Sequence, residues 1–396
     1  MTIEFDPRSP AFRRDPYPYY DLLRTNAPVF YWPAWGITFL TRHDDCSELL
    51  RDNRLGHGMM GDASSESPLA QRALFDMQAN WLLFKNPPDH TRLRGLVHKA
   101  FTPRMIEQLR STVQAITDGL LDRVQAAGEM DLIADLAYPL PVTVIAEMLG
   151  IPEADRQAFH EWSDALARSL DLTEDPAVYE RANQAAATFT AYLRELANRR
   201  RVEPQADLLS ALVAVEEAGD HLTEAELYAT CSLLLIAGHE TTINLIGNGT
   251  LALLRHPEQL ALLRQNGALI KPAIEELLRY DSPVQMTSRM VLEKVAVRGQ
   301  TLQPGQQVSF MLGAANRDPE VFSTPDVLDI TRKNNPHLAL GGGIHYCLGA
   351  PLARLEGQIA LETLLRRVPT LALNTATPIY RDNYVLRGLE ALPVTF

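Results

Sequence analysis

A glycine-rich turn that ends in a single cysteine constrains the C-terminal part of this chain. Three consecutive glycines begin at Gly341, and Cys347 follows the last of them by four positions. Glycine adopts positive φ angles without steric cost, so such a turn lets backbone N–H groups converge on one sulfur. Pro351 suits the first turn of a helix, and apolar residues at helical spacing follow it. We therefore predict that the Cys347 sulfur lies at the N-terminus of a helix over 351–367, where a thiolate is favoured.

Three interpretations of Cys347 are open from these residues. The first is a buried cysteine in a tight loop, although three glycines plus Gly349 add an entropic cost that a plain loop does not need. The second is a nucleophile with His345 as its base, which is disfavoured because neighbouring side chains on a turn diverge. The third is a thiolate ligand of one metal centre. A structural zinc site is not indicated, since the other cysteines are Cys46 and Cys231 and the chain has no C-x-x-C pair.

A second informative segment is a single long helix predicted over 223–255. Ala237 and Gly238 precede Thr241 by four and three positions, so we expect the three to share one face of that helix. Such a face is a flat patch of small side chains with one hydroxyl, which suits a planar cofactor. We expect His239, one residue further round the helix, to point away from that patch. An ordinary buried helix with a polar bend is the alternative.

These two segments resemble the cytochrome P450 family. The family's haem-binding loop has the pattern Phe-x-x-Gly-x-x-x-Cys-x-Gly, which Gly343, Cys347 and Gly349 match here, with Leu340 at the Phe position. Its long helix has the pattern Ala/Gly-Gly-x-Asp/Glu-Thr-Thr, which residues 237–242 match. The resemblance implies haem b as cofactor, with Cys347 as the axial thiolate ligand of the iron. The departure at Leu340 concerns the tuning of the iron potential and not the ligation itself.

The resemblance also implies roles for polar residues elsewhere in the chain. Glu240 and Thr241 would be the acid–alcohol pair that relays protons during O–O cleavage. Positive groups would hold the two haem propionates. They are His90 and Arg94, one turn apart on a helix that begins near Pro87, together with Arg289 and His345. The remaining residues expected at the cofactor are small, and they are Ala237, Gly238, Gly341 and Gly349.

The resemblance also covers a charge pair. Glu276 and Arg279 lie at i,i+3 spacing, which by itself indicates no more than a surface salt bridge. In the family pattern the pair is the Glu-x-x-Arg element, tied to a further arginine that we assign to Arg332. Its role would be structural, on the proximal side of the cofactor.

The predicted fold class is mainly α with a small β region. We expect the P450 fold, as a single large domain over residues 1–396. Helical periodicity covers the segments 103–127, 139–149, 153–170, 177–200, 223–255, 257–265, 268–280 and 351–367. Strand-like alternation is confined to 28–41, 285–298, 306–311 and 384–396. We expect residues 54–85 to form a mobile loop and residues 317–336 to form an irregular, well-packed meander.

Composition excludes several classes of protein. The chain has 396 residues and a net charge of −12, which argues against nucleic acid as a partner. Three cysteines in this length indicate a reducing compartment. The N-terminus lacks a signal sequence, and the longest apolar span, 231–254, is interrupted by His239, Glu240 and Asn244, so no membrane anchor is predicted. We therefore expect a soluble, cytoplasmic enzyme of the bacterial type.

The function predicted from the resemblance is that of a haem-thiolate monooxygenase. It would insert one atom of O₂ into a C–H or C=C bond of an apolar small molecule and reduce the other atom to water. A macrolide, a terpenoid and a fatty-acyl substrate fit equally well, as in secondary metabolism. Two alternatives stay open: a peroxide-driven haem-thiolate peroxygenase, and a haem-binding sensor or carrier without turnover.

The resemblance implies electron donors and a substrate pocket outside the core motifs. Electrons would come from a ferredoxin and its ferredoxin reductase, with the ferredoxin docking on basic residues that we assign to Arg92, Lys99, Arg104, Lys333 and Arg354. The pocket would be lined from the 54–85 loop, the long helix and two later segments. Its candidate residues are Met59, Met60, Trp81, Leu82, Leu233, Ile236, Ala237, Val284, Gln285, Met286, Val385 and Leu386.

Overall fold

The computed structural model describes residues 6–7, 9–58, 72–170, 175–217 and 221–396. By their internal contacts the described residues form two compact units. The first unit draws on the segments Met1–Gly56, Thr117–Pro139 and Thr241–Phe396, and the second on His57–Ile116 and Leu140–Glu240. Each unit thus joins segments that are far apart in the sequence.

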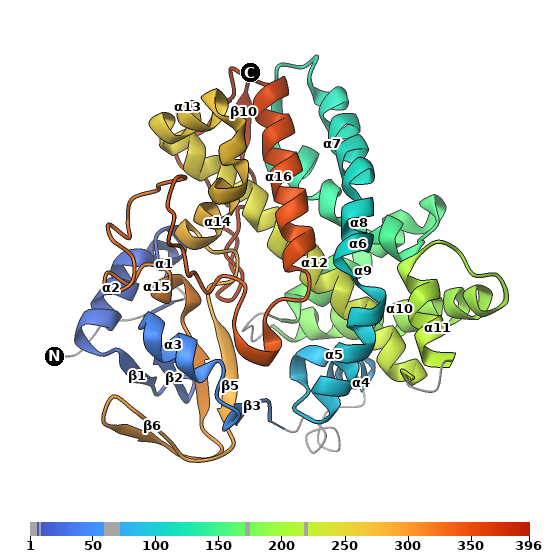
Figure 1. Cartoon of the computed structure of the whole chain (residues 1–396), viewed down its shortest axis with the longest axis horizontal. Coiled ribbons are helices and arrows are strands. Elements are labelled where there is room, and N and C mark those ends of the chain that lie inside the picture. Colours follow the sequence, from blue (N-terminus) through green and yellow to red (C-terminus); the bar gives the residue numbers. More distant parts are fainter. Residues whose placement is uncertain (1–5, 8, 59–71, 171–174, 218–220) are drawn as a thin grey trace. The chain divides into compact units, whose positions relative to one another are not determined.

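The first unit contains a five-stranded sheet with the strand order β1-β2-β8-β5-β3. Strands β2 and β8 run parallel, and the other neighbours are antiparallel. Figure 1 shows N-terminal strands in blue beside C-terminal strands in orange, so the sheet ties the two ends of the chain together. The strands are β1 (Val29–Trp32), β2 (Ile37–Leu40), β3 (Leu55–Gly56), β5 (Thr287–Val291) and β8 (Gln307–Phe310).

Two small sheets complete the β structure of the described residues in this unit. One has the order β4-β10-β9 and the other pairs β6 with β7. The predictions of strands within 28–41, 285–298 and 306–311 are confirmed. The prediction over 384–396 is wrong except at its end, because only β10 is a strand there. The additional strands are β4 (Glu129–Asp131), β6 (Val295–Val297), β7 (Gln300–Leu302), β9 (Ala372–Leu373) and β10 (Pro393–Thr395).

Helices of the first unit pack on one another. The C-terminal helix α16 (Ala350–Arg367) packs on α14 (Ile270–Tyr280). Helix α1 ends at its C-cap residue Asp15. Pro257 and Pro351 lie in the first turns of α13 and α16, because the fixed φ of proline suits that position. The other helices here are α1 (Pro10–Arg14), α2 (Tyr17–Asn26), α3 (His43–Leu49), α13 (Pro257–Gln265) and α15 (Leu312–Ala315), with a π-helical turn at Ile133–Ala137.

The described residues of the second unit form helices and loops, without a strand. Its longest helix, α10, packs against α4, α9 and α11. The helices are α4 (Arg72–Ala79), α5 (Asp89–Ala100), α6 (Pro103–Gln108), α8 (Pro139–Leu149), α9 (Arg156–Arg168), α10 (Pro176–Val202) and α11 (Leu208–Glu217). Three helices have residues in both units, namely α7 (Arg110–Val124), α8, of which Pro139 belongs to the first unit, and α12 (Glu224–Arg255).

Two sequence predictions of local structure are wrong. Residues 54–85 were expected to form a loop, but they contain β3, the helix α4 and a 3₁₀ helix at Leu82–Phe84. Asn183 fixes α4 by accepting a hydrogen bond from the Leu74 N–H, a tertiary contact that periodicity cannot reveal. The helix expected over 103–127 is two helices, because the chain tightens at Leu109, whose N–H donates to the Ile106 carbonyl at i−3.

The prediction for the segment before the cysteine loop holds. Residues 317–336 contain no helix or strand, yet Phe322, Leu328 and Ile330 are buried there, so the well-packed meander is confirmed.

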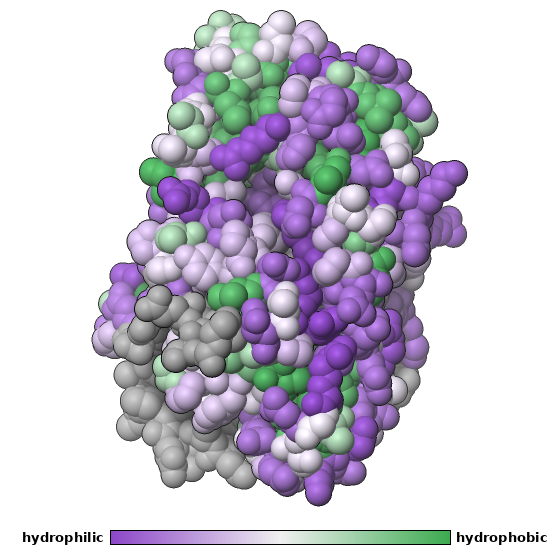
Figure 2. All heavy atoms as spheres, turned by 90° about the vertical axis from the view of Figure 1, so that its left-hand side faces the viewer, coloured by the Kyte–Doolittle hydropathy of each residue, from purple (hydrophilic) through white to green (hydrophobic). Residues whose placement is uncertain are grey.

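No helix of the described chain is long and apolar enough to cross a membrane. The face shown in Figure 2 is mostly hydrophilic, with scattered apolar patches.

Candidate functional site

The loop that carries Cys347 has the backbone that its glycines predict. Gly341 and Gly343 have φ angles of 73° and 64°, in the left-handed region. A Cβ on Gly343 would collide with the backbone carbonyl of Leu50, so the loop lies directly on the end of α3. The Cys347 N–H donates to the Leu340 carbonyl at 2.9 Å, which closes the turn. Helix α16 begins at Ala350, and the thiol therefore lies next to its N-terminus.

Cys347 differs from the other two cysteines in its access to solvent. Its side chain is half-buried, whereas Cys46 and Cys231 are completely buried. Burial raises the pKa of Cys231 to about 12 and that of Cys46 further still, so both stay neutral thiols. Because all three are free, Cys347 is the one cysteine of this chain placed to act as a thiolate ligand.

The middle of α12 carries an accessible strip on an otherwise buried helix. Leu233, Ala237 and Thr241 are spaced four residues apart, with Ala237 exposed and the other two half-buried. The adjacent positions Ile236 and Glu240 are buried. The strip is small and apolar with one hydroxyl, so it presents a surface that a flat ring system can approach.

Gly238 does not complete that strip as expected. A Cβ on Gly238 would meet the Cδ1 atom of Ile145, so this glycine is the point of close approach between α12 and α8. One residue turns a helix by about 100°, which separates Gly238 from Ala237. The shared face predicted from spacing therefore reduces to Ala237 and Thr241, and Gly238 packs two helices together.

Arg289 is a buried cation without an acidic partner in the described part of the chain. It is 6% exposed on β5, and its Nη1 donates to the Ser288 carbonyl at 2.7 Å and to the Thr287 hydroxyl at 3.3 Å. Burial lowers its pKa to about 10. A buried guanidinium without a counter-ion is costly, so this position calls for an anionic group such as a haem propionate.

The other positive residues expected at the cofactor occupy both units. His345 ends a 3₁₀ helix at Gly343–His345, half-buried and two positions before Cys347. In the second unit, His90 is buried and Arg94 half-buried, one turn apart on α5 as predicted. The first unit holds a thiol at a helix N-terminus and a buried arginine without an acidic partner. The second unit holds two basic residues one turn apart on α5. Both sets have the chemistry that fits a haem and its two carboxylates.

Glu240 has a polar neighbour, His239, to which the sequence pattern assigned no role. The Nε2 atom of His239 lies 3.9 Å from the Glu240 Oε2 and 3.7 Å from the Asp164 Oδ1. The His239 ring points toward the neighbouring helix α9. This agrees with the prediction that it faces away from the patch of small side chains. The sequence held one signal for this contact: Ser163 and Asp164 are adjacent polar residues in the amphipathic helix α9.

The predicted tie between Glu276, Arg279 and Arg332 is present. Arg279 makes two hydrogen bonds to Glu276, both 2.8 Å, and the Arg332 Nε lies 3.1 Å from the Glu276 Oε2. Neither Glu276 nor Arg279 is exposed at all, so the interpretation of the pair as a surface salt bridge is wrong. Arg279 also donates to the carbonyls of Asn316, Pro325 and Val327, which fixes the meander onto α14.

Two of the predicted pocket segments lie side by side in the first unit. Val284 and Leu386 form an antiparallel bridge, and the Gln285 N–H donates to the Val385 carbonyl at 2.8 Å. Met286, by contrast, belongs to a core cluster with Tyr20 and Phe39. The segments therefore form one wall, from which Val284 and Val385 retain accessible surface.

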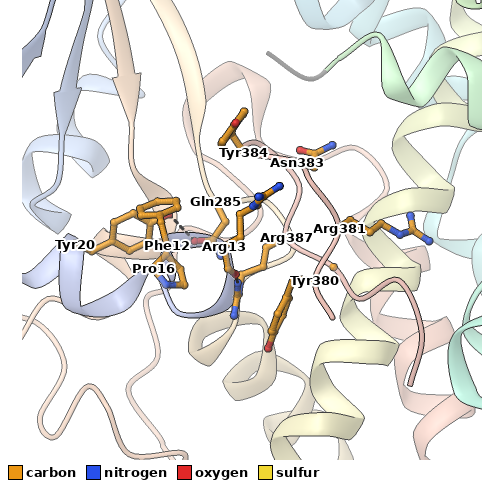
Figure 3. A pocket seen from close by; sticks show the side chains of 11 residues that line it. Phe12, Arg13, Pro16, Tyr20, Gln285, Tyr380, Arg381, Asn383, Tyr384 and Arg387 are labelled. Carbon is orange, nitrogen blue, oxygen red and sulfur yellow. Dashed lines mark hydrogen bonds between the residues drawn. The ribbon is translucent and has the colours of Figure 1, made fainter. Parts of the chain in front are cut away.

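A pocket beside this wall has a lining that sequence reasoning missed (Figure 3). Gln285 is held there by the Tyr20 hydroxyl, which donates to its Oε1 at 2.9 Å. Arg387 stacks on Tyr380, 3.8 Å from the ring centroid, and donates to Asp281 at 2.7 Å. The pocket is lined by Phe12, Arg13, Pro16, Tyr20, Gln285, Tyr380, Arg381, Asn383, Tyr384, Arg387 and Gly388.

The pocket candidates of the second unit are mainly core residues. Trp81 is completely buried, and its indole N–H donates to the Ser232 hydroxyl at 2.8 Å. Leu82 and Ile236 are buried as well, which leaves Leu233 as the candidate with accessible surface besides Ala237. Met59 and Met60 lie outside the described residues.

Two of the five basic residues assigned to ferredoxin docking are already paired. Arg92 forms an ion pair with Glu226, and Arg354 donates to both carboxylate oxygens of Glu275 at 2.6 and 2.8 Å. Lys99, Arg104 and Lys333 are exposed. The positive charge offered to a partner is therefore smaller than the sequence suggests.

Comparison with known proteins identifies the family. The family model for cytochrome P450 matches residues 39–379. A biotin biosynthesis cytochrome P450 from Bacillus subtilis (strain 168) is 44% identical over 401 residues, covering 100% of both chains. The cytochrome P450 monooxygenase PikC from Streptomyces venezuelae is also 44% identical, covering 97% of this chain and 91% of the relative.

Solved structures agree with these relatives. The crystal structure of P450BioI in complex with an acyl carrier protein ligated to hexadec-9Z-enoic acid has a TM-score of 0.93 at 44% identity, covering 98% of this chain and 100% of that one. A myxobacterial cytochrome P450 in complex with myristic acid has a TM-score of 0.90 at 42% identity, covering 98% of both chains. The chain therefore belongs to the cytochrome P450 family of haem-thiolate monooxygenases.

Proposed function

We propose that this monooxygenase hydroxylates or epoxidises a fatty-acyl chain, with Cys347 as the axial ligand of its haem. The observation that carries the ligand assignment is the half-buried Cys347 at the N-terminus of α16, in a chain whose other two thiols are completely buried. The acyl substrate is inferred from two relatives that are described in complex with myristic acid and with an acyl carrier protein bearing a hexadecenoic acid. The mainly apolar candidates Val284, Val385 and Leu233 suit such a chain.

The chain's own residues divide the remaining work. When bound, the haem supplies activation of O₂, and a thiolate ligand favours O–O cleavage by donating charge. Arg289, His345, His90 and Arg94 hold the propionates. Glu240 and Thr241 deliver protons, since a carboxyl group linked to water can be reprotonated after each turnover.

The ligand assignment is tested by the reduced, CO-treated protein. Wild-type protein is expected to give the red-shifted Soret band of a thiolate-ligated haem. Cys347→Ser removes the thiolate and should abolish that band, whereas Cys231→Ser, a buried control, should keep it. A thiolate spectrum that survives in the Cys347→Ser variant would contradict the assignment.

The substrate assignment is tested by spin-state titration. Myristic acid and a hexadecenoic acid, free and attached to acyl carrier protein, are expected to shift the haem to high spin and to be oxidised. A macrolide or a terpenoid that binds more tightly than any acyl compound would overturn the acyl proposal. Turnover should consume NAD(P)H through ferredoxin reductase and ferredoxin. Product from peroxide alone would support a peroxygenase, and binding without product a sensor.

We further propose that residues 1–396 act as one haem domain in the cytoplasm and accept electrons from an acidic ferredoxin. Three free cysteines support a reducing compartment. Lys99, Arg104 and Lys333 are the exposed members of this basic group. Changing each to Glu should slow reduction and flatten its dependence on salt. Unchanged rates in all three variants would exclude docking through these residues.

A further inference from the structure

We propose that His239 is the group through which Glu240 exchanges protons with solvent, with Asp164 at the outer end of the path and Ser163 orienting the ring. The inference deepens the proposed function and rests on it, because it assumes that Glu240 delivers protons to the reaction. All four residues belong to the second unit, on α9 and the adjoining half of α12.

Geometry places His239 between an inner and an outer carboxylate. Its side chain is completely buried, and its Nε2 lies 3.9 Å from the Glu240 Oε2 and 3.7 Å from the Asp164 Oδ1. The Glu240 side chain is 11% exposed, whereas that of Asp164 is 50% exposed. The imidazole thus connects a nearly buried acid to one that is in contact with water.

The contacts of the two ring nitrogens indicate which of them carries a proton. The Nδ1 of His239 lies 2.8 Å from the hydroxyl oxygen of Ser163, a residue with no exposed surface. Two carboxylate oxygens face Nε2, and ionised carboxylates only accept hydrogen bonds. A proton on Nε2 is therefore favoured, either in the neutral ring, with the Ser163 hydroxyl donating to Nδ1, or in the imidazolium, with Nδ1 donating to Ser163.

The charges around this group favour repeated protonation. Asp164 and Glu240 attract a proton to the ring. The further ionisable residues of α9 are Arg156, His160, Glu161 and Arg168, and Glu147 of α8 forms an ion pair with Arg156. Burial opposes a charged imidazole, so the two carboxylates and the desolvation act in opposite directions.

The transfer balances without any additional reactant. The transfer starts from the imidazolium, whose Nε2 gives its proton to the Glu240 carboxylate and leaves a neutral ring with its proton on Nδ1, donated to Ser163. Asp164, reprotonated by water, then returns one proton to Nε2 and becomes a carboxylate again. Both separations exceed a direct hydrogen bond, and a modest side-chain rotation or one bridging water is enough to close each of them. A residue that merely fills space beneath α9 would need neither the polar Ser163 nor an acid that reaches solvent.

The test measures coupling, which is the product formed per NAD(P)H consumed, in the complete enzyme. His239→Phe keeps a ring but removes both nitrogens, and Asp164→Asn keeps shape but removes the outer acid. We expect His239→Phe to lower coupling about tenfold or more, to raise the solvent deuterium isotope effect and to shift the pH profile. Asp164→Asn should shift the same profile with a smaller loss. Glu161→Gln, an exposed acid on α9, should match the wild type.

A second measurement does not depend on turnover. In protein labelled with ¹⁵N-histidine, the His239 signal, identified by its loss in His239→Gln, should show a protonated Nε2, and Asp164→Asn should lower the pKa of the imidazole. If His239→Phe fails to bind haem, His239→Gln and Ser163→Ala provide the same comparison of coupling. An unprotonated Nε2, or wild-type coupling and pH profile in the His239 and Asp164 variants, would overturn the proposal.

Glu240→Gln separates failure of this relay from failure of the proposed function. Loss of coupling in Glu240→Gln alone, with the His239 variants unaffected, would reject the relay and keep the role of Glu240. Wild-type coupling in Glu240→Gln would reject the role of Glu240, and the relay with it.

Discussion

Glu276 and Arg279 form a two-point ion pair, with Nε to Oε2 and Nη2 to Oε1 both at 2.8 Å, and neither side chain is exposed to solvent. The pair is embedded in further hydrogen bonds, because Asp329 and Asn335 also donate to the same carboxylate. Glu276 therefore joins α14 to three points of the chain between residues 329 and 335.

Removing one partner of this pair should strongly destabilise the protein. Glu276→Gln leaves the Arg279 guanidinium buried without its counter-charge, and we expect a loss of about 3–5 kcal/mol in the free energy of unfolding. The neighbouring residue offers a matched control, since Glu275 pairs with the partly exposed Arg354. Glu275→Gln should cost clearly less than Glu276→Gln, because Glu275 and Arg354 both keep contact with solvent. Equal losses in chemical denaturation of the two variants would contradict this.

Glu275 should make stability depend on acid. Burial raises its pKa, but hydrogen bonds and charge from Arg354 and His337 outweigh burial and lower the pKa to about 2 from an ordinary 4.5. The folded protein thus binds fewer protons than the unfolded chain between these values. Stability from this group is complete above pH about 4.5 and is lost as the pH falls toward 2. Denaturation midpoints of Glu275→Gln should decline less steeply over that window than those of the wild type.

Glu356 should have the opposite effect. It is completely buried on α16, neither carboxylate oxygen has a hydrogen-bond partner in the described residues, and burial raises its pKa well above 4.5. The folded state therefore holds a proton that the unfolded chain releases, so stability falls as the pH rises above 4.5. Glu356→Gln should flatten this decline, and its stability relative to wild type should increase from pH 5 to 8.

Glu362 provides the control for that experiment, because it is exposed on the same helix. Glu362→Gln should follow the wild-type pH dependence. A Glu356→Gln variant whose stability runs parallel to the wild type across this range would show that the buried carboxyl group titrates normally.

Two glycines of the cysteine loop should differ in their tolerance of alanine. Gly341→Ala meets open space, with the His345 carbonyl oxygen at 3.8 Å, so its main cost is the positive φ, about 1–2 kcal/mol. Gly343→Ala carries the same strain and also collides with the Leu50 backbone. Gly343→Ala should therefore lower the melting temperature more and release haem faster. The opposite order would mean that the loop does not rest on α3.

Residues in repeating local patterns were largely predictable. Helices α8, α12, α14 and α16 follow from apolar spacing, and the position of Cys347 before α16 follows from glycine and proline chemistry. The break at Leu109 was not predictable, because a single tightened turn ends the helix there. Helix α4 was not predictable either, because a hydrogen bond to another helix fixes it.

The order of residues is enough to predict the chemical groups of this protein: a single cysteine in a glycine turn, an acid beside a threonine on a long helix, and cations for two carboxylates. The environment of each group depends on contacts between distant segments. These contacts placed Glu276 and Arg279 out of solvent, turned Gly238 against Ile145, and set His239 between Glu240 and Asp164. Sequence spacing specifies which residues share a helix face, but burial and charge depend on the other elements that cover that face.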